Sequence, residues 1–190
     1  MIYFFNSEDS KELINEVFEK LQNREWENFR NLVSTEIVFC SFSTKNDDIL
    51  MWSHYTDEHK GIVIGFDSSN FDRLHRVEYK NQRPLIHFIS NVDIVERQKD
   101  AETVMTTKYI SWKYEDEWRR IIPRSEVFEN PDNKAILFAP FDLNSVKTVI
   151  CGCKMNKSQE DQIYALLSKY PNCKIQHAKI HKRNFALDIE

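Results

Sequence analysis

Glycine is scarce in this chain of 190 residues, which contains only Gly61, Gly65 and Gly152. A dinucleotide-binding fingerprint or a phosphate-binding loop needs several glycines within a few residues, because phosphates must approach the backbone closely there. The sequence therefore excludes doubly wound dinucleotide-binding folds and phosphate-loop nucleoside triphosphatases.

Long apolar runs are also missing, since no stretch approaches the roughly 20 residues of a membrane-spanning helix. The first residues carry no basic leader followed by an apolar segment, as a secretory signal would. Four cysteines without such a signal indicate free thiols in a reducing compartment. We therefore expect a cytoplasmic protein that has no membrane partner.

The chain also has no excess of positive charge, since its formal net charge is −4. Such a chain lacks the positive field that draws proteins to phosphate backbones, so nucleic acid is not expected as a tight non-specific ligand. The apolar fraction of 41% and the length are typical of one folded domain. We predict a single domain over 1–190, with a helical N-terminal piece (1–35) and a body over 36–190.

The spacing of apolar residues predicts an α+β fold with N-terminal helices, a mixed central sheet of about six to eight strands and a C-terminal βαβ-like unit. Helices are predicted at 8–22, around Trp26, after a cap at Asp47 or Asp48, mainly over 92–110, and at 158–169. Strands are predicted at 36–43, 62–66, 76–80, 84–89, 115–122, 146–151, 174–178 and 185–189, with a turn over 124–134.

Two segments, 51–61 and 108–120, are unusually rich in aromatic residues interleaved with His, Glu and Arg. Such a mixture suits a pocket that stacks a planar ligand and stabilises developing charge. It also suits a polar surface packed by aromatic rings, so composition alone leaves both interpretations open.

Short motifs in the chain resemble a bacterial family called domain of unknown function 2971. The resemblance runs from about residue 36 to the end and depends on several spaced matches. They are Cys40-Ser41-Phe42-Ser43, Leu50-Met51-Trp52-Ser53-His54-Tyr55, His59-Lys60-Gly61-Ile62, Lys108-x-x-x-Trp112-x-Tyr114-Glu115-x-Glu117-Trp118-Arg119 and the tail Val149-Ile150-Cys151-Gly152-Cys153-Lys154-Met155.

The resemblance implies a domain similar to the ADP-ribosyltransferase superfamily, which splits NAD at the nicotinamide bond. NAD is then the substrate, no metal is expected, and a protein, a nucleic acid or water accepts the ADP-ribose. Bacterial toxin and phage-defence systems are the setting that such a resemblance implies.

Glu117 is the candidate catalytic acid, because a carboxylate stabilises the oxocarbenium ion that forms when the nicotinamide–ribose bond breaks. In a strand over 115–122, Glu115, Glu117 and Arg119 share one face. The alternative is a structural ion pair between Glu117 and Arg119.

His54 is the second candidate catalytic residue, as a donor to a ribose or phosphate oxygen. The residues expected to bind the NAD substrate are Ser43, Trp52, Tyr55, Trp112 and Arg119. The structural alternative places Trp52 and Trp112 in the core and His54 against neighbours on its own helix.

Two other groups of residues offer alternative chemistries. Cys40 with His54 as base would make a thiol nucleophile, but a cysteine inside an apolar strand is usually an inert core residue. Cys151, Cys153, Cys173, His177 and His181 offer enough ligands for zinc, but they lack the knuckle spacing.

The chain departs from the family pattern in one respect. Members of the family usually begin with a strand that carries a basic-aromatic pair, and an Asn-Asp-Pro-Phe-like loop follows that strand. This chain has neither feature. This departure leaves a second class of function open, namely a non-catalytic module that binds a partner protein.

Overall fold

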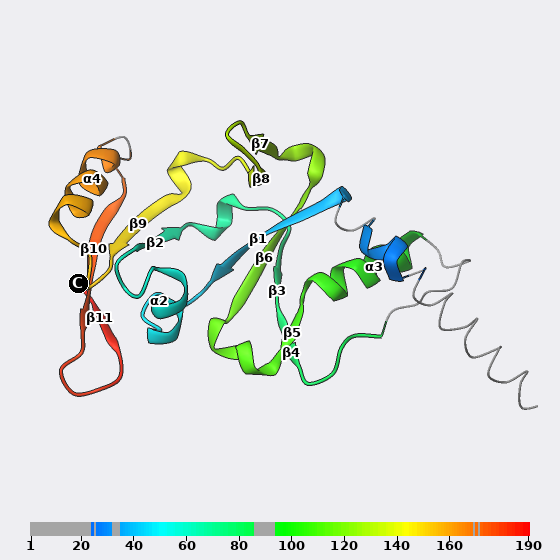
Figure 1. Ribbon diagram of the computed structural model, residues 1–190, viewed down its shortest axis with the longest axis horizontal. Coiled ribbons are helices and arrows are strands. Elements are labelled where there is room, and N and C mark those ends of the chain that lie inside the picture. Colours follow the sequence, from blue (N-terminus) through cyan, green and yellow to red (C-terminus); the bar gives the residue numbers. More distant parts are fainter. Residues whose placement is uncertain (1–23, 25, 32–34, 86–93, 169, 171) are drawn as a thin grey trace, which may run out of the picture.

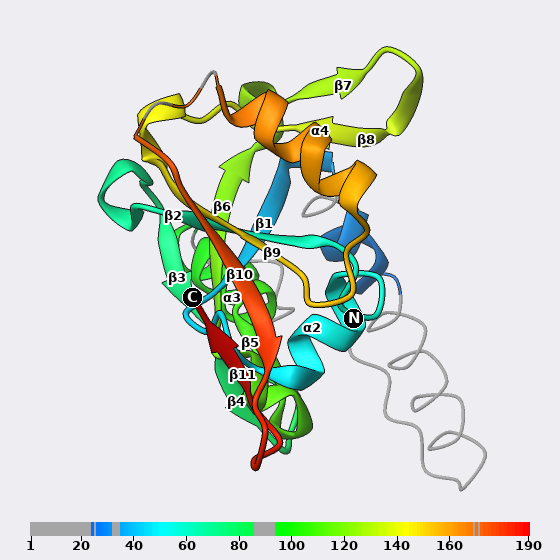
Figure 2. The same cartoon turned by 90° about the vertical axis from the view of Figure 1, so that its left-hand side faces the viewer.

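The computed structural model describes residues 24, 26–31, 35–85, 94–168, 170 and 172–190. Two sheets lie side by side, with helix α4 (Lys157–Leu167) on one outer side and helix α3 (Ile94–Met105) on the other (Figures 1 and 2). Short strands and 3-10 helices lie in the connections between the longer elements. This arrangement confirms the α+β class.

The first sheet is antiparallel and has the strand order β1-β6-β3. Its strands are β1 (Ile37–Ser43), β6 (Glu117–Pro123) and β3 (Leu74–Arg76). In the register of β1 with β6, Ser41 lies opposite Arg119 and Ser43 opposite Glu117. Since opposite residues share a face, these four polar residues lie on one face of the pair.

The second sheet has the order β11-β10-β9-β2. Its strands are β2 (Ile62–Phe66), β9 (Val146–Cys151), β10 (Lys174–Ile180) and β11 (Leu187–Ile189). Strands β9 and β10 are parallel and α4 connects them, which confirms the predicted βαβ-like unit. Asn156 caps α4 through a reciprocal pair of hydrogen bonds with Gln159.

A compact apolar cluster supports this second sheet. Trp52, Ile150, Ala178 and Leu187 form its buried centre. Trp52 comes from helix α2 (Ile49–Tyr55), which Asp48 caps by accepting hydrogen bonds from two backbone N–H groups. Helix α2 thus contributes Trp52 to the core and lies between the two sheets (Figure 1).

The remaining elements are short. They are the parallel pair β4 (Glu78–Lys80) and β5 (Thr107–Tyr109), the hairpin β7 (Phe128–Asn130) and β8 (Asn133–Phe138), and 3-10 helices at Ser68–Asn70, Ile110–Glu115, Arg124–Glu126 and Leu143–Ser145. Among the helices of the described residues, none has the length and apolar character needed to cross a membrane.

Several predicted details differ from the structure. The strands are distributed over separate sheets rather than one central sheet, because strand pairing is set by contacts distant in sequence. The helix predicted to 110 ends at Met105 and a short strand follows, while the turn predicted over 124–134 contains a 3-10 helix, strand β7 and the start of strand β8. The helix predicted at 8–22 lies outside the described residues; residues 26–31 are helical.

Candidate functional site

The candidate site lies where the 3-10 helix Ile110–Glu115 meets strand β6. Asp116 joins these elements in a left-handed conformation with φ of 43°. Its carboxylate is held by the hydroxyl of Thr44 and by Arg76, whose Nη2 lies 3.0 Å from Oδ1. This turn brings the carboxylates of Glu115 and Glu117 to one place, although Glu115 lies before the strand and not within it as predicted.

Glu117 accepts four hydrogen bonds from three side chains. Ser41 Oγ and Arg119 Nε donate to Oε1 at 2.5 and 2.7 Å, and Lys108 Nζ and Arg119 Nη2 donate to Oε2 at 3.0 and 3.2 Å. The backbone N–H of Glu117 donates to Tyr79 Oη at 2.8 Å. The carboxylate is therefore fixed in position on all sides.

Burial alone would raise the pKa of Glu117, but the hydrogen bonds from Arg119, Ser41 and Lys108 outweigh it and lower the pKa to about 2. Glu117 is thus ionised at neutral pH. An ionised carboxylate is the form that stabilises a sugar cation, so the catalytic role of Glu117 stays a prediction.

Arg119 is anchored independently of Glu117. Its Nη1 donates to the backbone carbonyl of Met105, and its guanidinium lies 4.5 Å from the centre of the Phe39 ring. Arg119 and Glu117 form an ion pair with Nε and Oε1 2.7 Å apart, which is the structural alternative that the sequence left open. The pair is almost completely buried, so its loss leaves an unpaired charge inside the protein.

Glu115 extends the network towards α2. Tyr55 Oη donates to its Oε1 at 2.7 Å, and Lys108 Nζ donates to its Oε2. The hydrogen bond to Glu115, assisted by burial, raises the pKa of Tyr55 to about 12. Ser43 Oγ donates to the backbone carbonyl of Glu115 at 2.6 Å and so fixes the turn.

An exposed aromatic and imidazole cluster borders this buried network. Tyr114 Oη and His54 Nδ1 lie 3.2 Å apart, and the His54 ring packs edge-on against Tyr55 and Tyr114. Trp112 is 40% exposed and lies beside both Tyr114 and Lys108. The structural alternative that placed Trp112 in the core is therefore wrong, and its role in binding a ligand stays a prediction.

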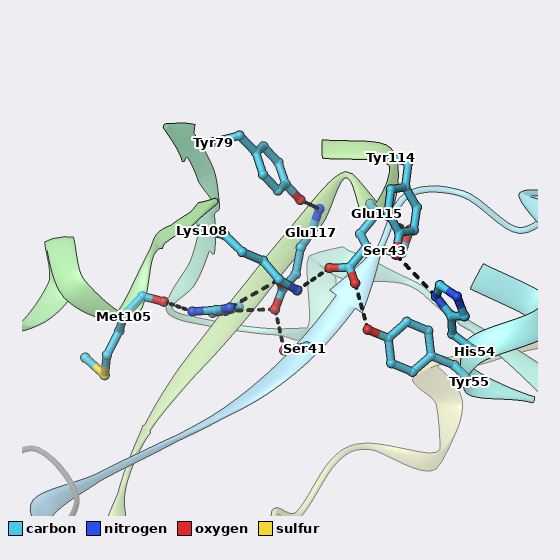
Figure 3. A network of polar contacts seen from close by, with 11 residues as sticks. Ser41, Ser43, His54, Tyr55, Tyr79, Met105, Lys108, Tyr114, Glu115 and Glu117 are labelled. Atoms are coloured by element: carbon cyan, nitrogen blue, oxygen red, sulfur yellow. Dashed lines mark hydrogen bonds and ion pairs between the residues drawn. The ribbon is translucent and has the colours of Figure 1, made fainter. Parts of the chain in front are cut away.

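Of the predicted site residues, the structure brings together Ser43, His54, Tyr55, Trp112, Glu117 and Arg119. Figure 3 shows Ser43, His54, Tyr55 and Glu117 within the polar network. His54 reaches Glu117 only indirectly, because Tyr55, Glu115 and Lys108 lie between them. Trp52 is not part of the cluster: it is 1% exposed, and its indole N–H donates to the carbonyl of Asn46 at 2.7 Å. The core interpretation of Trp52 is confirmed, and no face of this ring is open to a ligand.

Sequence reasoning missed Ser41, Tyr79, Lys108 and Tyr114 as members of the network, and assigned no role to Glu115. Ser41, Lys108, Tyr114 and Glu115 all lie within the motifs that carry the family resemblance. Their position in these motifs could have identified them as members of the network. No pattern in the sequence could have identified Tyr79, because its contact with Glu117 depends on how β4 lies beside β6.

The thiol alternative gains no support from the geometry. Cys40 alternates with Ser41 and lines an apolar groove of about 470 Å³ together with Phe42, Phe71 and Arg120, on the face away from Glu117. The residue is exposed and not enclosed in the core as predicted, yet partial desolvation raises the pKa of its thiol. A raised pKa keeps the thiol protonated and weakly nucleophilic.

Within the described part of the chain, no group of three or more His, Cys, Asp or Glu side chains is arranged to hold a metal ion. His177 pairs instead with Glu160, with Nε2 2.7 Å from Oε1. Cys151 is buried in β9, and burial raises the pKa of its thiol.

Residues 51–120 match the model of a family described as "Protein of unknown function (DUF2971)". This match confirms the resemblance over residues 51–120, a range that contains His54, Tyr55, Lys108, Trp112 and the Glu115–Arg119 segment. No curated protein and no solved structure matches the chain. The family description assigns no activity, so function must be argued from the site.

Proposed function

We propose that this protein binds NAD and breaks its nicotinamide–ribose bond, as an ADP-ribosyltransferase or NAD glycohydrolase. The observation that supports the proposal is the buried, ionised carboxylate of Glu117 beside a cluster of exposed His54, Tyr55 and Trp112 and half-buried Tyr114. A fixed negative charge next to aromatic faces suits a reaction in which a sugar becomes cationic and a planar ring leaves.

In the proposed reaction the bond between ribose C1′ and the nicotinamide nitrogen breaks, and nicotinamide leaves with the electron pair. The ribosyl carbon becomes an oxocarbenium ion, which the Glu117 carboxylate stabilises. Water or a hydroxyl, amine or other nucleophile of a macromolecule then bonds to C1′ and loses a proton. Glu117 needs to stay ionised throughout, which the lowered pKa ensures.

The surrounding residues supply orientation. Arg119 and Ser41 hold the carboxylate through Oε1, and Arg119 is itself held by Met105 and Phe39. His54 lies at the exposed border, where its ring can donate to a ribose or phosphate oxygen of the substrate. We place the reaction in the bacterial cytoplasm, as a toxin or phage-defence effector, on the strength of the family resemblance.

Release of nicotinamide from NAD by the purified protein tests the proposal. We expect Glu117→Gln to lower the rate by about 10²- to 10³-fold, the usual effect of removing one preorganised electrostatic contact. Glu129→Gln is the matched control, because Glu129 is an exposed carboxylate paired with Arg124 at 2.8 Å. Wild-type protein that releases no nicotinamide, with or without an added protein or nucleic-acid acceptor, contradicts the proposal.

A second candidate function, a non-catalytic module that binds a partner protein, is favoured by one observation. Both oxygens of Glu117 already accept two hydrogen bonds each within the protein. In this second interpretation the carboxylate has a structural role and holds β1, β5 and β6 together. Thermal shifts distinguish the two functions, since NAD at a hundredfold its Kd stabilises a binding protein by about 2.7 kcal/mol and leaves a non-binding module unchanged.

A further inference from the structure

Lys108 is the most exposed of the charged side chains in the buried network. Its side chain is 22% exposed, whereas those of Glu115 and Glu117 are 3% and 5% exposed. Its Nζ donates to Glu115 Oε2 and lies 3.0 Å from Glu117 Oε2. The ammonium group therefore lies between solvent and the two carboxylates.

The same ammonium lies 5.0 Å from the centre of the Trp112 ring. Two carboxylate oxygens and an indole face thus surround one positive charge. This combination binds organic cations, because the carboxylates supply the charge and the ring quadrupole attracts a cation over its face. In the resting protein the chain fills that environment with its own lysine.

The other donors to Glu117 cannot move aside as easily. Arg119 is fixed by Met105 and Phe39, and Ser41 lies within strand β1. Lys108, in contrast, carries its charge on a four-carbon stem with several rotatable bonds. A cationic ligand that pairs with Glu115 Oε2 and Glu117 Oε2 therefore competes with the Lys108 ammonium.

We infer that Lys108 occupies a subsite for the pyridinium ring of the oxidised nicotinamide nucleotide and competes with that ring for it. This inference rests on the proposed function. It adds that the site selects the positively charged, oxidised nucleotide over the uncharged, reduced one. The pyridinium ring is a planar cation that stacks on Trp112 and faces Glu115 and Glu117. A reduced, uncharged nicotinamide ring has no charge with which to replace the ammonium.

The subsite also accounts for product release. When the C1′–nitrogen bond breaks, the electron pair goes to the ring nitrogen and nicotinamide becomes neutral, while the positive charge passes to the ribosyl carbon. The neutral ring then has no electrostatic advantage over Lys108. The ammonium returns to Glu115 and Glu117 and displaces the product.

The test compares two small probes by calorimetry, the cation 1-methylnicotinamide and neutral nicotinamide. We expect the wild-type protein to bind the cation in preference to the neutral ring. Lys108→Met removes the internal competitor and tightens binding of the cation about tenfold, with no change for the neutral probe. Lys108→Arg keeps a competing cation and stays close to wild type, and Lys113→Met is the matched control for loss of an exposed lysine nearby.

Trp112→Ala should weaken binding of the cation about tenfold without affecting neutral nicotinamide. This variant changes a residue that is 40% exposed, so it keeps the test decisive even if Lys108→Met fails to fold. The inference is overturned if the wild-type protein binds the two probes with equal affinity, or if Trp112→Ala leaves the affinity for the cation unchanged.

Failure of the subsite and failure of the proposed function are distinguishable. If NAD is cleaved but the wild-type protein shows no preference for the cation, the charge-selective subsite is overturned and the activity stands. If the cation is preferred, sensitive to Trp112 and strengthened by Lys108→Met, but NAD is not cleaved, the subsite stands as an organic-cation site and the NAD-cleaving function falls.

Discussion

The two sheets of this protein differ in the interactions that stabilise them. The β2-β9-β10-β11 sheet packs around Trp52, Ile150, Ala178 and Leu187, so burial of apolar surface holds it together. The polar face of the β1–β6 pair instead buries two carboxylates and an arginine, which stabilise the fold only while each remains paired. Apolar packing is largely indifferent to pH, whereas a buried charged network is not.

The largest expected effect comes from removing one charge of the network. Arg119→Ala leaves Glu117 buried with Ser41 and Lys108 as its remaining side-chain partners. We expect the free energy of unfolding to fall by about 3–5 kcal/mol, as measured by urea denaturation. Arg124→Ala, which breaks only an exposed pair with Glu129, should cost less than about 1 kcal/mol. Similar costs for both variants would mean that the network contributes no more than a surface ion pair.

The corresponding change in the apolar sheet is Ile150→Ala. Ile150 is buried at the centre of the cluster, so the substitution leaves a cavity and should cost about 3 kcal/mol. Because no ionisable group is altered, this loss should be the same in urea titrations at pH 7 and pH 4. A loss that depends strongly on pH would show that the two sheets are not stabilised independently.

Acid should destabilise the network before the apolar sheet. The pKa of Glu117 is lowered from 4.5 to about 2 in the folded protein, so its contribution is complete above pH 4.5. It is lost as the pH falls from 4.5 towards 2, where Glu117 becomes protonated. We expect Glu117→Gln to flatten this part of the stability curve. The other carboxyl groups with lowered pKa values supply the slope that remains, and they are Asp67, Asp72, Asp116, Glu126 and Glu160.

The smallest effect is expected at the edge of the network. Tyr55→Phe removes one hydrogen bond to Glu115 and should cost about 1 kcal/mol at neutral pH. The raised pKa of Tyr55 makes this contribution complete below about pH 10, and it is lost as the pH rises to about 12. Ultraviolet titration should therefore show a phenol ionising near pH 12 that is absent from Tyr55→Phe and present in the control Tyr109→Phe.

A Tyr55→Phe titration identical to that of wild type would contradict the contact with Glu115. Glu115→Gln tests the same contact independently, because loss of the carboxylate charge should lower the pKa of Tyr55 towards its ordinary value of 10.

The two sheets also differ in how well the sequence predicted them. The C-terminal βαβ-like unit was predicted closely, since α4 and its flanking strands have regular apolar spacing and short connections. Asp48 was also recognised as one of two possible caps of α2. These features are local, so neighbouring residues suffice to specify them.

The polar sheet was predicted less well because its contacts join distant segments. Ser41 and Glu117 are 76 residues apart, and Tyr55 and Glu115 are 60 residues apart. The alternation of β6 correctly placed Glu117 and Arg119 on one face. No local pattern, however, shows that Lys108 binds both carboxylates or that Asp116 turns the chain between them.

The most direct test of the central claim is a crystal structure of the protein with NAD or a non-hydrolysable analogue bound. We predict density for the nicotinamide riboside between Trp112 and Glu117, with a ribose hydroxyl within hydrogen-bond distance of the Glu117 carboxylate and the Lys108 ammonium displaced. Density in the apolar groove beside Phe42 and Phe71, or an undisturbed Lys108 with no ligand beside Glu117, would contradict the claim.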